Sequence, residues 1–114
     1  MIKIYHNPRC SKSRQSLDLI HEIGHEPEVI LYLETKPDYR ELSGIFEKLG
    51  LQSALDMTRT KEPEFKEASL SKDSRNEDIL KAIAQHPKLL ERPIVITDKG
   101  ARIGRPPENV KEIL

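Results

Sequence analysis

The sequence predicts an α/β fold built on a mixed four-stranded sheet, in the order β-α-β-α, a helical insertion, and then β-β-α. Short apolar or β-rich runs at residues 2–5, 28–33, 94–97 and 101–103 are typical of strands. Apolar residues three and four apart between these runs predict amphipathic helices. Two strands joined by a helix should be parallel, whereas the last two, joined by Asp98-Lys99-Gly100, should form an antiparallel hairpin. Helices on both faces would cover such a sheet.

The first two long helices have clear boundary signals. A helical pattern runs from Ser11 to about Ile23, and Gly24 follows as the residue expected just past a helix end. A second pattern follows Asp38, which with Glu41 resembles a capping box, and it ends at Gly50.

The middle of the chain is less regular. Residues 53–57 and 63–68 predict two short helices, the second opening with Pro63. Ser74 with Glu77 is a capping box that predicts a longer helix, ending before His86-Pro87. A last helix is expected over residues 108–114. We interpret residues of about 51–87 as a helical insertion within a single domain of residues 1–114.

Composition excludes several classes of protein. The chain has 114 residues, enough for one domain with a real core. Lysine plus arginine equals aspartate plus glutamate at 19 each, which argues against a general nucleic-acid binder. No apolar run approaches the roughly 18 residues of a membrane span, and no signal peptide is recognisable. A single cysteine excludes an internal disulfide and fits a reducing compartment, so we expect a soluble cytoplasmic protein.

That cysteine, Cys10, stands where a strand turns at Pro8 and a helix begins. Unpaired backbone N–H groups and the positive end of the helix dipole stabilise a negative charge there, so the position favours the reactive thiolate. The neighbouring cations Arg9, Lys12 and Arg14 act in the same direction. A lone cysteine is more often a small buried apolar residue, but this setting favours a nucleophile.

Four separated segments resemble the ArsC family, which comprises glutaredoxin-coupled arsenate reductases with a thioredoxin-like fold. The resemblance runs nearly from end to end, and the segments agree in order and spacing. They are Tyr5-His6-Asn7-Pro8-x-Cys10-x-x-Ser13, Tyr32-Leu33-Glu34-Thr35, Arg92-Pro93-Ile94-Val95-Ile96-Thr97 and Arg105-Pro106.

The resemblance assigns roles to several residues besides the catalytic Cys10. It implies that Arg59, Arg92 and Arg105 bind the oxyanion and that Pro93 is a cis-proline facing the active-site turn. The histidine of the first motif maps to His6, whose side chain either lies near the thiolate or stands at a strand end. Guanidinium groups suit arsenate, because they keep their charge and donate two hydrogen bonds to a tetrahedral oxyanion.

The chemistry expected is reduction of arsenate to arsenite through attack by the Cys10 thiolate. Because the chain has no second cysteine, an external thiol must complete the reaction; the resemblance implies glutathione and glutaredoxin, with no bound cofactor. Ser13 occupies the place of a resolving cysteine, and we expect it to cap the helix together with Ser11. A phosphatase-type enzyme would need Cys-x5-Arg, but the sixth residue after Cys10 is Ser16.

Two other functions are compatible with the sequence. A regulatory adaptor resembling the Spx proteins would bind RNA polymerase, although the usual Cys-x-x-Cys switch is missing. A related thiol oxidoreductase would act on another oxyanion or a mixed disulfide. It stays open because the chain stops at Leu114, whereas longer ArsC proteins continue. His21 and His25 have metal-ligand spacing, but Gly24 predicts that the helix is ending there, so we expect no metal site.

Overall fold

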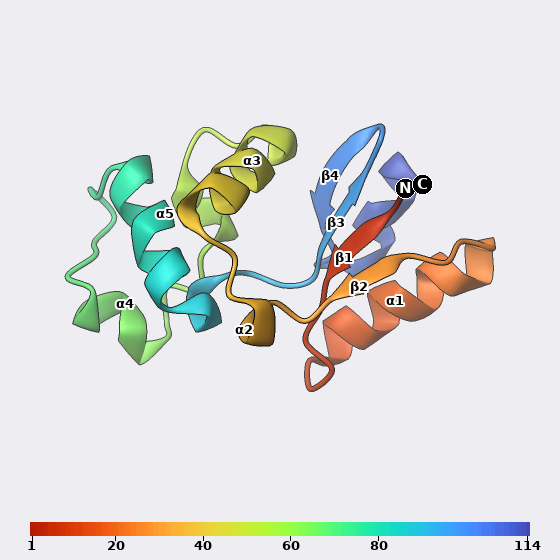
Figure 1. Cartoon of the computed structure of the whole chain (residues 1–114), viewed down its shortest axis with the longest axis horizontal. Helices are drawn as coiled ribbons and strands as arrows, with labels where there is room; N and C mark the ends of the chain where they lie inside the picture. The colour runs from red at the N-terminus through yellow and green to blue at the C-terminus, as the bar shows by residue number, and fades with distance from the viewer. The chain divides into compact units, whose positions relative to one another are not determined.

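The computed structural model describes all residues from Met1 to Leu114 (Figure 1). The chain divides into two compact units. Unit 1 comprises Met1–Thr35 and Arg92–Leu114, and unit 2 comprises Lys36–Glu91.

Unit 1 holds the whole sheet, whose four strands lie in the order β2-β1-β3-β4. β1 and β2 are parallel, while β3 is antiparallel to both β1 and β4, so the mixed four-stranded sheet and the C-terminal hairpin are confirmed. The strands are β1 (Lys3–Tyr5), β2 (Glu28–Ile30), β3 (Ile94–Thr97) and β4 (Gly100–Ile103).

One face of this sheet forms the core of unit 1. Ile4 lies opposite Val95 on the neighbouring strand, so both side chains are on the same face. They pack with Ile20 of α1 (Ser11–Ile23) and with Val110 and Ile113 of η3 (Pro107–Ile113). The last helix is therefore a 3₁₀ helix rather than the α-helix that a helical pattern suggests. Burying these side chains holds α1, and hence its N-terminus, at a fixed place beside the sheet.

The second strand is shorter than the sequence predicts. The apolar run Glu28–Leu33 predicts one strand, but β2 ends at Ile30 and a short helix, α2 (Tyr32–Thr35), follows. The reason is that its partner β1 ends at Tyr5, and the His6 N–H to Ile30 carbonyl bond of 2.9 Å continues the pairing by only one step. Without a strand to pair with, the backbone satisfies its N–H groups locally as a helix.

Unit 2 is helical. Asp38 accepts a hydrogen bond of 2.8 Å from the Glu41 N–H at the start of α3, and Gly50 ends that helix in the left-handed conformation, as predicted. Helices α3 and α5 pack together through buried aliphatic side chains that include Leu42 and Ile83. The helices are α3 (Tyr39–Leu49), η1 (Ala54–Met57), α4 (Pro63–Glu67), α5 (Asn76–Gln85) and η2 (Pro87–Leu89).

The predicted capping box at the start of α5 is wrong. Arg75, not Ser74, is the N-cap residue, and the Ser74 hydroxyl accepts the Ser71 N–H at 2.9 Å instead. The helix starts one residue later because Asn76 is held by its neighbours: its Oδ1 accepts the Ala54 N–H at 2.8 Å. A tertiary contact therefore sets this boundary.

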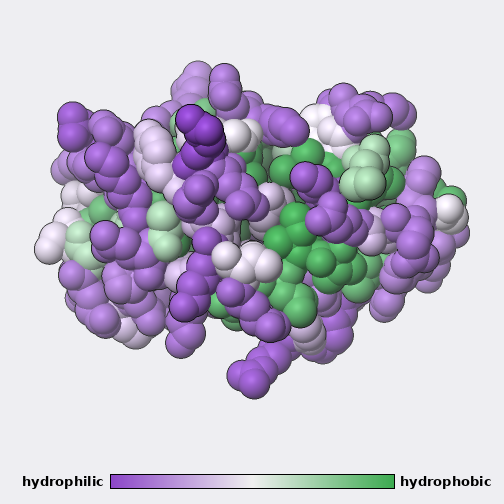
Figure 2. All heavy atoms as spheres, viewed as in Figure 1, coloured by the Kyte–Doolittle hydropathy of each residue, from purple (hydrophilic) through white to green (hydrophobic).

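The surface shown in Figure 2 is largely hydrophilic, with its main hydrophobic area in the part of the picture that unit 1 occupies. Exposed apolar side chains of that unit include Ile23, Val29 and Leu33. None of the helices combines the length and the hydrophobicity that a membrane span requires.

Candidate active site

The turn between β1 and α1 is built by Asn7. Its carbonyl accepts the Cys10 N–H at 3.0 Å, and its side-chain Oδ1 accepts the Arg9 N–H at 3.0 Å. Pro8 and Arg9 form the turn between these two bonds. Cys10 then takes an extended backbone conformation as the N-cap residue of α1, which leaves its half-buried sulfur at the helix N-terminus.

The Cys10 thiol is more acidic than an ordinary cysteine. Burial raises its pKa, but a hydrogen bond from the Ser13 N–H and the positive charge of Arg92 outweigh that effect, so the pKa is lowered. The Lys12 N–H and a side-chain hydrogen bond from Arg92 act in the same direction. The Cys10 side chain makes no capping hydrogen bond to the helix as a neutral thiol. The N–H groups of Ser13 and Lys12 therefore act chiefly on the thiolate.

Two predicted arginines lie beside this sulfur. Arg105 Nη1 is 3.8 Å from Cys10 Sγ and 3.4 Å from the Arg92 carbonyl oxygen. The Arg92 side chain lies close enough to the sulfur to lower the pKa of the thiol. Residues more than 80 positions from Cys10 in the sequence are thus brought to its sulfur within unit 1. A thiolate flanked by two guanidinium groups is suited to attack an oxyanion, because the same cations neutralise the nucleophile and its target.

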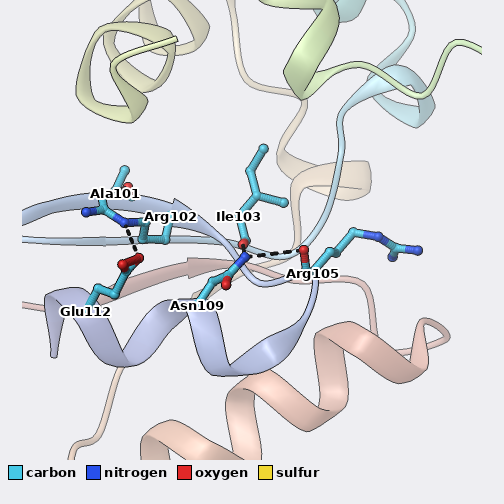
Figure 3. A network of polar contacts seen from close by, with 6 residues as sticks. All are labelled: Ala101, Arg102, Ile103, Arg105, Asn109 and Glu112. Atoms are coloured by element: carbon cyan, nitrogen blue, oxygen red, sulfur yellow. Dashed lines mark hydrogen bonds and ion pairs between the residues drawn. The ribbon is translucent and has the colours of Figure 1, made fainter.

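The backbone of Arg105 is fixed by the segment that follows β4. Asn109 of η3 donates hydrogen bonds from Nδ2 to the Arg105 carbonyl at 3.3 Å and to the Ile103 carbonyl at 3.4 Å (Figure 3). Figure 3 also shows the Arg105 guanidinium pointing away from this network. Asn109 therefore holds the main chain while leaving the charged group available to the site.

Close packing next to Arg105 explains why residue 104 is a glycine. A Cβ on Gly104 would lie 2.8 Å from the Pro93 ring and would also collide with the Ser16 hydroxyl of α1. The Gly104 N–H donates to the Pro93 carbonyl at 2.9 Å, so α1, the residue before β3 and the segment of Arg105 meet here. The peptide bond before Pro93 is cis, as the resemblance implies, and so is the one before Pro106, which was not predicted.

His6 and Ser13 form a buried pair behind the turn. His6 Nδ1 and Ser13 Oγ are 2.6 Å apart, and Ser13 Oγ also accepts the Asn7 N–H at 3.0 Å. The expected capping role of Ser13 is therefore wrong, since its hydroxyl bonds to the turn and not to a helix N–H. Burial, together with the charge of Arg14, lowers the pKa of His6, which keeps the imidazole neutral near pH 7.

Arg59 belongs to unit 2, where its contacts are local. Its Nη1 forms an ion pair of 2.7 Å with Glu62, and its backbone N–H donates to the Leu89 carbonyl at 2.7 Å. Unit 1 thus brings Cys10, Arg92 and Arg105 together, while Arg59 lies in unit 2. The substrate-binding roles of the three arginines stay predictions.

Several contributors to the site carry no clear sequence signal. Asn7 belongs to the first motif, but its two hydrogen bonds to the Arg9 and Cys10 N–H groups become apparent only in the folded turn. In the sequence, Asn109 and Ser16 look like ordinary helix residues. Only Gly104, which lies between a strand and an Arg-Pro step, indicates a closely packed position. No group of three histidine, cysteine or acidic side chains is arranged to hold a metal ion.

A separate groove of about 620 Å³ lies at another part of unit 1, lined by residues that include Ile2, His25 and Leu114. It contains none of the residues assigned to the site. The chemistry is therefore expected at the open turn around Cys10 rather than in this groove.

Comparison with known proteins identifies the family of the chain. A model of the ArsC family matches residues 5–113. An arsenate reductase of Neisseria meningitidis serogroup A is 53% identical over 114 residues, covering 99% of this chain and 97% of the relative. An arsenate reductase of Escherichia coli K12 is 41% identical, with 99% of this chain but 80% of the relative covered.

Among solved structures, an arsenate reductase from Vibrio cholerae superposes with a TM-score of 0.94 at 48% identity, covering 99% of this chain and 97% of the other. Relatives with the same name thus include one that this chain covers almost completely and one of which it covers four fifths. On this similarity, which extends over nearly every residue, the chain belongs to the ArsC family.

Proposed function

We propose that the protein is an arsenate reductase that uses Cys10 as its nucleophile and an external thiol as its reductant. The observation that carries the proposal is the Cys10 sulfur of lowered pKa with the Arg105 guanidinium 3.8 Å away and Arg92 beside it. Relatives named arsenate reductase at about 50% identity support the choice of oxyanion. We take the reducing cytoplasm as its place of action.

The first step is attack by the Cys10 thiolate on arsenic. A sulfur–arsenic bond forms, one arsenic–oxygen bond breaks, and that oxygen leaves as water after protonation, with arsenic still in the +5 state. Arg92 and Arg105 stabilise the charge on the remaining oxygens, where planar guanidinium donors act best. Arg59, as the third arginine that the family uses, contributes to the same binding.

The second step needs a sulfur from outside the chain, because Cys10 is the only cysteine. An external thiol attacks the Cys10 sulfur, a disulfide bond forms between them, and the electron pair of the sulfur–arsenic bond stays on arsenic, which leaves as arsenite. A second thiol then reduces the mixed disulfide and restores Cys10. Following the family, we assign glutathione and glutaredoxin to these two roles.

His6, Ser13 and Pro93 support the reaction without touching the substrate. The Ser13 hydroxyl joins His6 to the Asn7 backbone, and so holds the turn that presents the sulfur. Pro93 packs beneath Arg105 through its contact with the Gly104 position. We regard these three as positioning residues, with no metal and no bound cofactor taking part.

The test is a coupled assay with arsenate, glutathione and glutaredoxin. Cys10→Ser should abolish turnover. Arg92→Lys keeps the charge but loses the bidentate fork, and it should weaken arsenate use about tenfold. Lys111→Gln, a change on the exposed side of η3, serves as the control. Wild-type affinity for arsenate in Arg92→Lys would remove Arg92 from the site.

Two other outcomes point to the alternatives. If the wild-type protein does not reduce arsenate but captures RNA polymerase, the adaptor is favoured. If the wild-type protein does not reduce arsenate but exchanges readily with a glutathione mixed disulfide, a thiol oxidoreductase is favoured. The buried Ser13 in place of a second cysteine speaks against a dithiol switch.

A further inference from the structure

We propose that three cations around Cys10, namely Arg9, Lys12 and Arg14, select a thiol that carries carboxylates as the co-substrate. We call these three residues the cationic collar. The inference rests on the proposed function, since it concerns the thiol that follows arsenate into the same site. It gives these residues a role that the first motif does not. Arg9 and Lys12 occupy unspecified positions of that motif, and Arg14 directly follows its Ser13.

The collar is held close to the sulfur by the local backbone. Arg9 is exposed and directly precedes Cys10, with its N–H fixed by Asn7 Oδ1 at 3.0 Å. The Lys12 N–H is one of the donors to the sulfur, so its side chain starts within the same turn. Arg14 lies one helical turn after Cys10, and its Nη1 donates to the Pro8 carbonyl at 2.8 Å.

None of the three collar residues forms an ion pair with a carboxylate. Other cations of the chain, such as Arg75, Lys81 and Arg102, do form one. The charge at the turn is therefore uncompensated within the protein, although the whole chain has a formal net charge of zero.

The charge pattern of α1 also differs from that of the other α-helices. α3, α4 and α5 each carry an acidic residue in the first turn, which stabilises the positive end of the helix dipole. α1 has none there; its first acidic residue is Asp18, two turns along. Lys12 and Arg14 instead add positive charge where the dipole is already positive. Helix stability does not explain this pattern, whereas binding of an anion does.

Arsenate alone does not account for the collar. Arg92 and Arg105 lie at the sulfur itself and are matched to the oxyanion. Once arsenate neutralises them, the collar keeps three positive charges at the rim of the turn. The next reactant is a thiol whose sulfur must reach Cys10. Carboxylates a few bonds from that sulfur would meet the collar, while a neutral thiol would gain nothing from it.

The reaction of this thiol is the exchange described above, in which its sulfur bonds to Cys10 and arsenic takes the electron pair. The collar takes no part in bond making. It raises the rate of encounter and the affinity for the anionic thiol, so its effect should weaken as salt screens the charges.

The first experiment measures kcat/KM for the thiol in arsenate reduction, with glutathione and with glutathione diethyl ester. These two thiols share the reacting group but differ in charge. At low ionic strength, glutathione should be preferred about tenfold, and the preference should shrink in 0.5 M salt, where screening lengths are about 4 Å. The double variant Arg9→Gln/Lys12→Gln should lose most of the preference, and Lys111→Gln should keep it. An unchanged preference in the double variant would overturn the proposal.

A second measurement does not depend on arsenate. Iodoacetate and iodoacetamide alkylate Cys10 by the same displacement of iodide, but only iodoacetate is negative. Because any change in thiol acidity affects both reagents alike, their rate ratio isolates the charge effect. The double variant should lower the iodoacetate-to-iodoacetamide ratio about threefold to tenfold relative to Lys111→Gln.

The two measurements separate the possible failures. If arsenate is not reduced but the alkylation ratio depends on Arg9 and Lys12, the choice of arsenate is wrong and the charge selection at Cys10 stands. If arsenate is reduced and neither ratio responds to the double variant, the arsenate reductase stands and the collar has no selective role.

Discussion

At the scale of single residues, the acidity of Cys10 is a balance. Burial opposes the thiolate, while the Ser13 N–H, the charge of Arg92 and the Lys12 N–H favour it. The helix supplies the two N–H groups whatever the side chains are, so Arg92 is the contribution that a substitution can remove. The sequence predicted the nucleophile from its place at a helix N-terminus, but the dependence on Arg92 needed the fold.

Arg92→Gln should raise the pKa of Cys10, because it removes a positive charge and a side-chain hydrogen bond from the thiolate. Alkylation by neutral iodoacetamide at pH 6.5 should slow by about threefold to tenfold, and the rates of variant and wild type should converge above pH 9.5, where both thiols are ionised. The control is Arg102→Gln, which removes a guanidinium paired with Glu112 instead. Equal rates at pH 6.5 would contradict the role of Arg92.

His6 should make stability depend on pH. Burial and the charge of Arg14 lower its pKa below the ordinary value of 6.5, so the unfolded chain binds this proton more readily than the folded one. The stabilisation is therefore complete above pH 6.5 and is lost as the pH falls below that value. Urea midpoints at pH 7.5 and 5.5 should differ more for wild type than for His6→Gln. His25→Gln, at an exposed position, should behave as wild type, and equal differences in all three would contradict the assignment.

At the scale of helices and strands, boundaries with a backbone cause were predictable. Gly24 and Gly50 end α1 and α3 in the left-handed conformation, and Asp38 caps α3 through Glu41. Boundaries set by a partner were not. β2 stops where β1 does, and Asn76 starts α5 through its bond to Ala54. Periodicity and capping describe one segment at a time, so they carry no information about a neighbour's length or side chains.

The two glycines of α1 and α3 that differ in conformation should respond oppositely to alanine. Gly24 has φ of 101°, so Gly24→Ala should destabilise the protein by about 1 kcal/mol. Gly44 lies inside α3 with open space at its Cβ position, so Gly44→Ala should stabilise it by about 0.5–1 kcal/mol. Chemical denaturation measures both. A Gly24→Ala variant as stable as wild type would mean that this glycine does not fix the helix end after α1, and a destabilised Gly44→Ala variant would contradict the open space at residue 44.

At the scale of the whole chain, the candidate site was only partly predictable from sequence. The first motif identified Cys10, and the resemblance supplied Arg92 and Arg105 from the distant C-terminal part. The hairpin β3–β4 explains why they meet the sulfur: β3 pairs with β1, which leads directly into the Cys10 turn. Asn109 and Gly104, which hold Arg105, were missed because their roles exist only once the hairpin and η3 are folded.

Arg59 tests whether unit 2 takes part in the chemistry. If it binds arsenate as the family resemblance implies, Arg59→Gln should lower kcat/KM for arsenate by about tenfold, comparable to the loss of one charge-assisted contact of roughly 1.4 kcal/mol. Because the Cys10 pKa has no contribution from Arg59, iodoacetamide alkylation should keep its wild-type pH profile.

The matched control is Arg75→Gln, which removes an exposed arginine of the same unit that is paired with Asp78. It should leave both measurements unchanged. Arg92→Gln, by contrast, should alter both, because Arg92 serves the nucleophile as well as the oxyanion. Full arsenate activity in Arg59→Gln would confine the chemistry to unit 1, and its ion pair with Glu62 would then be a structural contact of α4.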